Sequence, residues 1–322
     1  MGSLLFRIHE AAGDVPFVIF LVIVGLFISL RIIPLTTGMM VNSAAGLAGK
    51  HLGKQYRTLV MNCSTNNPEF VTMMLALLLG GKQGIGGIGT PLGSNFANIY
   101  LIFFVAIVWL LGSLWFRDRS QFHRLLVLLG KEWKLVAWHL AMSIGMFLIA
   151  GFAFRLLTGQ FPIGTAATHP TTPSSRNIAI AAVACAVGVA IFVWRERYLR
   201  AARSELFDDI DDSDHIASWM RLAAGTLGLM IACYVVNEMF VVSTKLYSTV
   251  LAQVLGPSVF AAMHYFLGAL ITSLPELNVA IYNYRKLTSA DLNTGLSSAS
   301  TSNMSNLAVA GIGAAVALLL VG

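Results

Sequence analysis

Two glutamates stand at the end of the same short polar pattern, each within an otherwise apolar stretch. The first pattern reads T-N-N-P-E over Thr65–Glu69, and the second reads T-S-L-P-E over Thr272–Glu276. Residues four apart share one face of a helix, so the hydroxyl and the carboxylate of each motif can point at one site. The proline removes a backbone donor and disturbs the preceding turn, which frees carbonyl oxygens to turn toward a cation. The pair of motifs predicts a cation site with two carboxylates.

A second pair of polar motifs follows the glutamates at nearly equal spacing. One reads G-S-N-F-A-N over Gly93–Asn98, and the other reads T-S-N-M-S-N over Thr301–Asn306. Their serines follow the respective glutamates by 25 and 26 residues, and in both motifs the last asparagine is four residues after the serine. Polar residues repeated in this order within apolar segments indicate an internal repeat.

The available oxygen atoms suit a hard divalent cation. Ca²⁺ takes six to eight oxygen ligands, and two carboxylates, two threonine hydroxyls and the serine and asparagine oxygens can supply them. Two glutamate charges also neutralise one divalent ion, which lowers the cost of holding it away from water. The three cysteines are odd in number and lie in apolar stretches, which argues against a disulfide framework or a cysteine metal site.

The composition indicates a membrane protein. Apolar residues make up 57% of the 322 residues and charged residues 11%, whereas a soluble domain carries about 25% charged residues. Apolar runs near 20 residues predict an all-α polytopic protein in the lipid bilayer, with about eight transmembrane helices. Their expected limits are Val15–Leu35, Arg57–Gly80, Thr90–Leu111, Lys134–Phe154, Asn177–Trp194, Leu222–Val242, Val259–Tyr282 and Leu292–Val321.

The charge distribution predicts how the chain is divided and oriented. Residues 1–194 form a first half with helices one to five and the motifs of 62–98. Residues 195–217 form a charged cytoplasmic loop, and residues 218–322 form a second half with helices six to eight and the motifs of 271–306. Sixteen of the 21 Lys and Arg residues fall on one side, which is therefore expected to be cytoplasmic, with the N-terminus outside. The same rule accounts for the net charge of +6 without a nucleic-acid partner.

The two repeats are expected to have inverted topology, because the seventh helix comes five positions after the second, and an odd step reverses the direction of a span. Inverted repeats whose helices are broken near the bilayer midplane are the usual construction of secondary transporters. No nucleophile elbow or H-E-x-x-H motif is present, so we do not expect an enzyme.

At these residues the chain resembles the sodium/calcium exchanger family of the cation/Ca²⁺ antiporter superfamily. That family has two alpha-repeats, each reading roughly G-T-S-x-P-E and then G-N-x-x-G-S-N-x-x-N or D. The resemblance implies Ca²⁺ exchange by alternating access in the cell membrane, no resident cofactor, and a first and a sixth helix that slide over the core. It implies that Glu69 and Glu276 are the chief ligands. The further ligands that it implies are Thr65, Asn66, Ser94, Asn98, Thr272, Ser273, Ser302 and Asn306.

Three departures from the family pattern leave alternatives open. Asn66 stands where the family has serine and is similar to the proton-coupled branch of the superfamily, whereas Ser273 matches the sodium-coupled branch. The stretch Ser297–Thr301 lacks both glycines of its motif. Eight helices also make a chain that is shortened relative to the ten of the family. Exchange of Ca²⁺ for Na⁺ is the leading hypothesis, and Ca²⁺/H⁺ exchange, a passive cation channel and a degenerate non-transporting member are the alternatives. The sequence predicts no oligomeric state.

Four further polar features lie outside the repeated motifs. His139 and His264 are interpreted as packed histidines rather than ligands, and the acidic run within 205–214 as a solvated loop rather than a regulatory Ca²⁺ site. Glu238, in the sixth span, is equally consistent with a packing role and an ion-site role.

Overall fold

The structure, a computed structural model, describes residues 2–53, 56–80, 88–159, 173–208, 216–255 and 273–321. All regular secondary structure in these ranges is helical, which confirms the all-α prediction. In chain order the helical segments are α1 (Gly2–Ala12), α2 (Asp14–Phe27), η1 (Ile28–Ile32), α3 (Ile33–His51), α4 (Arg57–Ser64), α5 (Asn67–Gly80), α6 (Gly89–Ile99), η4 (Tyr100–Val105), α7 (Ala106–Arg117), α8 (Arg119–Lys131), α9 (Trp133–Thr158), α10 (Ser175–Ala202), α11 (Glu205–Asp208), α12 (Trp219–Leu255), α14 (Leu274–Tyr284) and α15 (Ser289–Val321).

Six helical runs within the described ranges are long and apolar enough to cross a bilayer. They are Asp14–His51, Pro91–Arg117, Trp133–Leu157, Ser175–Ala202, Trp219–Val236 and Ser289–Leu320. Each coincides with one of the spans expected from the sequence. Of the other two, Arg57–Gly80 is broken into α4 and α5, and most of Val259–Tyr282, with His264, lies outside the described residues. The chain is a multi-pass integral membrane protein, and the inverted orientation of its repeats stays a prediction.

The first span is longer than the sequence predicts, and it continues well beyond Pro34. The sequence places the end at Leu35, but α2, η1 and α3 form one helical run to His51. Pro34 lacks a backbone N–H, and the π-helical segment η1, with its wider turn, directly precedes α3. The Thr36 hydroxyl donates to the Ile32 carbonyl at 2.8 Å, which adds a hydrogen bond across this irregular turn. The helix therefore continues through the proline.

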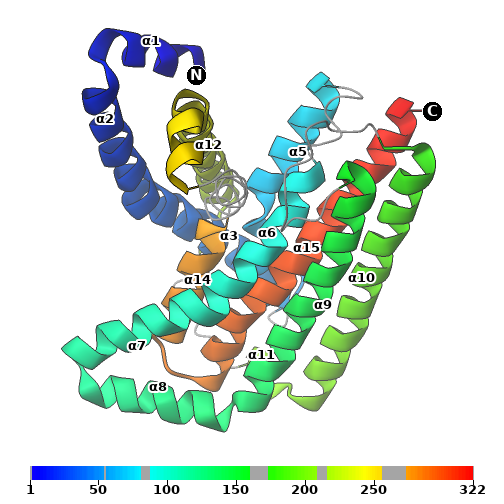
Figure 1. Cartoon of the computed structure of the whole chain (residues 1–322). Coiled ribbons are helices and arrows are strands. Elements are labelled where there is room, and N and C mark those ends of the chain that lie inside the picture. Colours follow the sequence, from blue (N-terminus) through cyan, green and yellow to red (C-terminus); the bar gives the residue numbers. More distant parts are fainter. Residues whose placement is uncertain are drawn as a thin grey trace.

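Helix α15 lies at the centre of the molecule. It packs against α6, α9, α10 and α14, and Figure 1 shows it running obliquely beside α9 and α10. Most of its buried side chains between Asp291 and Asn306 are polar. Buried polar groups need hydrogen-bond partners, so this stretch must be met by polar groups from the surrounding helices.

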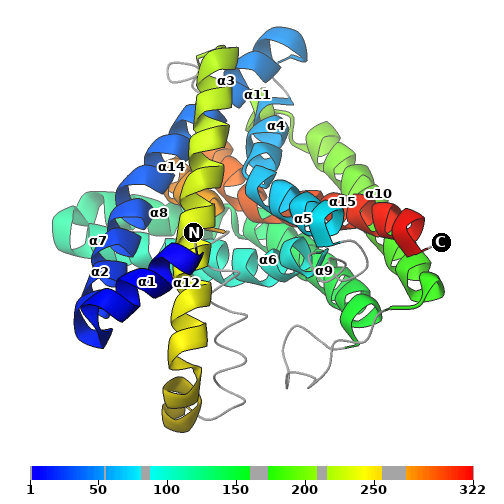
Figure 2. The same cartoon turned by 90° about the horizontal axis from the view of Figure 1, so that it is seen from above.

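Helices α3 and α12 form a second unit, which lies beside α1 and α2 and apart from α9 and α10 (Figures 1 and 2). Gly225 of α12 crosses directly over the backbone of α3. A Cβ atom there would lie 2.5 Å from the Met40 nitrogen and 2.9 Å from the Thr36 oxygen. Small residues let membrane helices approach closely, and here glycine is the residue that the crossing requires.

The turns on the predicted cytoplasmic side differ from the loops that the sequence suggests. Between the spans ending at Arg117 and starting at Trp133 lies a separate helix, α8, whose first turn is capped by the Asp118 carboxylate. Asp118 accepts hydrogen bonds from Ser120 N at 3.0 Å and Gln121 N at 3.1 Å. Helix α10 continues to Ala202, into the segment 195–217 that we expected to be a loop.

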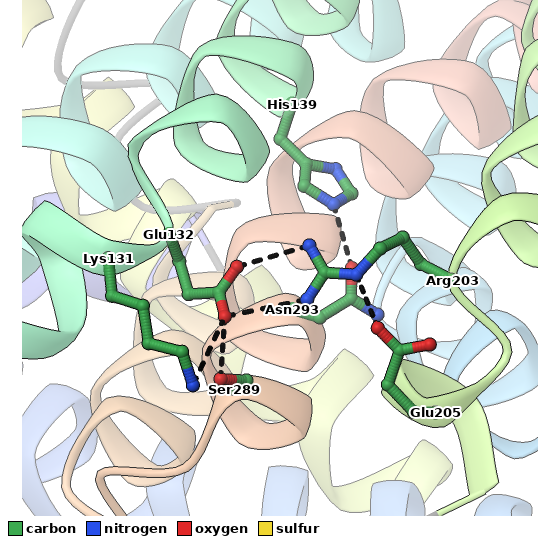
Figure 3. Close-up of polar contacts among 7 residues, drawn as sticks. All are labelled: Lys131, Glu132, His139, Arg203, Glu205, Ser289 and Asn293. Carbon is green, nitrogen blue, oxygen red and sulfur yellow. Dashed lines mark hydrogen bonds and ion pairs between the residues drawn. The ribbon is translucent and has the colours of Figure 1, made fainter.

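An ion-pair cluster joins three helix ends on this side (Figure 3). Glu132, which is 4% exposed at the start of α9, lies 3.2 Å from Arg203 Nη1 at the end of α10. It also accepts a hydrogen bond of 2.8 Å from Ser289 at the start of α15. Arg203 also pairs with Glu205, so one member of the acidic run 205–214 has an ion-pair partner. Residues 209–215 of that run lie outside the described residues.

Candidate functional site

Both glutamates occupy the same position at the start of a short helix. Glu69 is the third residue of α5, which is separated from the end of α4 at Ser64 by the turn residues Thr65 and Asn66, and Glu276 is the third residue of α14. The two side chains are buried, at 0% and 1% exposure. The positive end of a helix dipole stabilises a carboxylate in the first turn. This arrangement confirms the predicted helix break before Glu69. Thr272 and the segment before it lie outside the described residues.

Each glutamate is contacted by the serine of the second motif in its own repeat. Ser94 Oγ donates to Glu69 Oε1 at 3.5 Å, a long hydrogen bond. Ser302 Oγ lies 3.1 Å from Glu276 Oε1. The residues of the two pairs are 25 and 26 positions apart. The nearly equal spacing seen in the sequence therefore corresponds to equivalent contacts in the structure.

Asn66 connects the first repeat to the second. Its amide nitrogen donates to the Ser302 carbonyl at 2.8 Å, and its Oδ1 lies 2.7 Å from Ser302 Oγ. The Ser302 hydroxyl has one proton, so it cannot donate at full strength to Asn66 Oδ1 and to Glu276 Oε1 together. The Asn66 donor is directed to Ser302 rather than to Glu69.

The second motifs of the two repeats also contact each other, where α6 meets α15. Asn98 Nδ2 donates to Ser302 Oγ and to Asn303 Oδ1, both at 2.9 Å. Asn303 Nδ2 in turn donates to the Asn95 carbonyl at 3.0 Å. The predicted ligands Asn98 and Ser302 are therefore brought together, and Ser302 lies at the junction of the two repeats.

Thr65, at the break between α4 and α5, also reaches the second repeat. Its hydroxyl donates to the Asn62 carbonyl at 2.8 Å, and its side chain lies against the Glu276 carboxyl. Helix α12 contacts α5, the helix that begins at Asn67 and carries Glu69, so α12 borders the site.

Several buried polar atoms in these motifs have no hydrogen-bond partner among the described residues. They are Glu276 Oε2, Ser273 Oγ, Asn98 Oδ1 and both polar atoms of the Asn306 amide. Asn306 lies one turn beyond Ser302 on α15, about 6 Å along the axis, so it is near the junction but not joined to it by a hydrogen bond. Buried acceptors without donors are costly, and a bound cation satisfies such oxygens directly.

The described residues contain no group of three or more His, Cys, Asp or Glu side chains placed to hold a metal. A cation at Glu69 and Glu276 would thus be held by two carboxylates and by neutral hydroxyl, amide and carbonyl oxygens. That donor set suits hard cations rather than soft transition metals.

Two buried polar residues lie near the site: His139 has a packing role, and Asn62 was not predicted from the sequence. His139 contacts Ser300 Oγ at 2.8 Å and Asn293 Oδ1 at 2.9 Å, which confirms its interpretation as a packed histidine. Asn62 donates to Ser297 Oγ at 2.7 Å and was not among the predicted site residues. Its position in the same apolar stretch as Glu69 is the signal that could have identified it.

Comparisons with known proteins give one distant likeness. No family model matches the chain, and no curated protein matches it. A solved structure of the sodium–calcium exchanger NCX_Mj, soaked with Na⁺ and Sr²⁺, is similar to it with a TM-score of 0.41 and 18% sequence identity. The match covers 93% of this chain and 88% of that one. At this score and identity, the likeness does not assign a function.

Proposed function

We propose that the chain is a secondary antiporter that exchanges Ca²⁺ for Na⁺ at a site between its two repeats. The observation that carries the proposal is the duplicated arrangement of Glu69 with Ser94 and Glu276 with Ser302. The two buried carboxylates come from separate repeats, and the repeats meet at Ser302, which contacts both Asn66 and Glu276. Intramembrane acids are expensive and are usually functional.

The charge of the site favours a divalent cation as the transported substrate. Two ionised carboxylates in a buried site repel each other, and removing them from water costs several kcal/mol for each ion. One Ca²⁺ balances both charges and accepts the neutral oxygens around them as ligands. When it leaves, other cations must take its place, which couples the two fluxes.

Helix arrangement supports a carrier rather than an open pore. Helices α3 and α12 pack on each other, and they contact the helices that hold the glutamates: α3 contacts α14, and α12 contacts α5. Movement of such a pair relative to a fixed site would expose the carboxylates alternately to the two sides, as alternating access requires.

A second candidate function is Ca²⁺/H⁺ exchange, and the position of Asn66 favours it. Its amide donates to Ser302 rather than to Glu69. An asparagine at this position is similar to the proton-coupled branch of the superfamily, whereas Ser273 matches the sodium-coupled branch. On the other side, the Ser273 oxygen has no partner among the described residues and can serve as a Na⁺ ligand. We retain Na⁺ as the leading counter-ion on this basis.

The test is Ca²⁺ uptake into proteoliposomes that hold either a Na⁺ gradient or a pH gradient. We expect uptake to follow the Na⁺ gradient and to saturate with Ca²⁺. Asn66→Ser, which restores the residue typical of the sodium-coupled branch, should preserve Na⁺-driven uptake. Uptake that follows only the pH gradient in both proteins would replace Na⁺ by H⁺. Flux that needs no counter-ion and does not saturate would contradict the antiporter.

A further inference from the structure

A cavity of about 420 Å³ lies among α3, α4, α7, α14 and α15, next to the candidate cation site. Its wall includes Val279, one turn after Glu276 on α14, and Met61, the residue before Asn62. The described lining of the cavity includes none of the residues of the proposed cation site, and the chemistry of this lining indicates which kind of molecule the cavity can bind.

The charged groups that line the cavity are basic. Arg57, Arg285 and Lys286 line it, and the described lining includes no Asp or Glu. Lys286 lies 3.6 Å from Asp291 and is partly compensated, but Arg285 is exposed and has no ion pair among the described residues. The potential of this cavity therefore favours an anion and opposes a cation.

Two buried hydroxyls add hydrogen-bond donors to the same wall. Thr37 of α3 is 2% exposed and Thr58 of α4 is 4% exposed. Both line the cavity, and neither hydroxyl has a hydrogen-bond partner within the described part of the chain. Buried hydroxyls normally find a partner, so these two indicate a ligand that carries acceptor oxygens. Oxygens of a phosphate group match both the hydroxyls and the guanidinium groups.

The rest of the wall combines four polar residues, Asn42, Asn278, Asn283 and Thr294, with an apolar strip that reaches the surface of the molecule. Val41, Met61 and Ile281 line the cavity, and so do Trp109 and Tyr282, which are 65% and 46% exposed. Aromatic side chains of this kind are enriched where a membrane protein meets the headgroup region. A free inorganic anion would leave this apolar wall uncovered, whereas an acyl chain would cover it.

We propose that this cavity binds an anionic phospholipid, with its phosphate at Arg57, Arg285 and the two threonines and an acyl chain along the apolar wall. The occupant would lie between α3 and α14, the helix that carries Glu276. Its negative charge would cancel the basic potential beside the cation site. As a consequence that rests on the proposed function, anionic lipid should raise Ca²⁺ flux severalfold over that in a neutral bilayer.

Lipid binding is tested without measuring transport. The purified full chain is incubated with palmitoyl-oleoyl phosphatidylglycerol, with the matching phosphatidylcholine, or with glycerol phosphate, which has the headgroup charge but no chains. Retained molecules are counted by native mass spectrometry, and the thermal unfolding midpoint is recorded. We expect phosphatidylglycerol to be retained and to raise the midpoint, and the other two to do neither.

Variants assign the binding to this cavity. Arg285→Gln with Lys286→Gln, and separately the isosteric Thr58→Val, should each reduce retention at least threefold. Arg124→Gln, which removes an exposed positive charge from α8, is the matched control and should leave retention unchanged. Equal retention in the cavity variants and the control, or equal retention of phosphatidylcholine, would overturn the proposal. Binding of glycerol phosphate alone would show a simple anion pocket instead and would also overturn it.

The lipid proposal and the transport proposal can fail separately. Glu276→Gln should abolish flux and still retain phosphatidylglycerol, because Glu276 does not line the cavity. Retention without any lipid effect on wild-type flux would contradict the regulatory consequence. Loss of retention in Glu276→Gln would show that the bound lipid belongs to the cation site and would overturn a separate lipid site.

Discussion

Asn66 and Ser302 lie 236 positions apart in the chain and share two hydrogen bonds, of 2.8 and 2.7 Å. Since Ser302 also contacts Glu276, a residue of the first repeat is linked through one hydroxyl to the carboxylate of the second. A substitution at Asn66 in the first repeat should thus change the hydrogen bonding of Glu276 in the second. The predictions below follow from this connection and from the helix ends that support it.

Ser302→Ala should weaken Ca²⁺ binding. The substitution removes the contacts of the Ser302 hydroxyl to Glu276, Asn66 and Asn98 while keeping its backbone. Loss of one hydrogen bond to a charged group costs about 1.5 kcal/mol, or about tenfold in apparent affinity. The measurement is the Ca²⁺ concentration that gives half-maximal uptake.

Ser298→Ala is the matched control for Ser302→Ala. Ser298 is also buried on α15, but its hydroxyl donates to the Gly295 carbonyl of its own helix. We expect its apparent affinity to stay within about twofold of wild type, since a hydrogen bond within one helix makes only a small net contribution. If both variants shift the affinity equally, Ser302 has no special role at the site.

The sequence predicted the helical class, six of the spans and the residues that meet at Ser302, because hydrophobic runs and repeated motifs are local signals. It did not predict that the helix continues through Pro34 after a π-helical segment, or that α10 extends to Ala202. Both outcomes depend on neighbouring helices, which can override a local signal. The direction of the Asn66 amide likewise requires the position of Ser302, a tertiary contact that the chain order does not give.

The cluster around Glu132 should make stability depend on pH in the acid range. Burial acts to raise the pKa of Glu132, but hydrogen bonds from Arg203 and Ser289 outweigh it and hold this pKa below its usual value. A lowered pKa in the folded state means that the stabilisation is fully present above the ordinary glutamate pKa of 4.5 and is lost as the pH falls through the folded value. We expect the thermal unfolding midpoint of wild type to decrease once the pH is lowered below about 4.5.

Glu132→Gln should be less stable at neutral pH and should show a smaller further loss on acidification. Glu205→Gln, an exposed member of the same cluster, is the control and should follow the wild-type profile more closely. Thermal unfolding between pH 7 and about pH 3.5 distinguishes the variants. A parallel fall of wild type and Glu132→Gln would show that another group titrates.

Topology gives an independent prediction, since the helix count places the chain segments that follow the two glutamate motifs on opposite sides, and the distribution of Lys and Arg says which side is cytoplasmic. In a cysteine-free background, a cysteine at Lys82 should be labelled from outside and one at Lys286 only from inside. A cysteine at Arg155, at the end of α9, is the control and should react from the same side as the one at Lys82. If the cysteines introduced at Lys82 and Lys286 are labelled from the same side, the inverted arrangement is contradicted.

The most direct test of the two-carboxylate site is Ca²⁺ uptake by Glu69→Gln and Glu276→Gln in proteoliposomes, with equal amounts of inserted protein. Each variant removes one buried charge and leaves the divalent ion undercompensated, which costs several kcal/mol in a desolvated site. We expect uptake to fall at least a hundredfold in both variants, and to be unchanged in Glu10→Gln, an exposed acid of α1. Uptake near the wild-type level in either Glu69→Gln or Glu276→Gln would contradict the site.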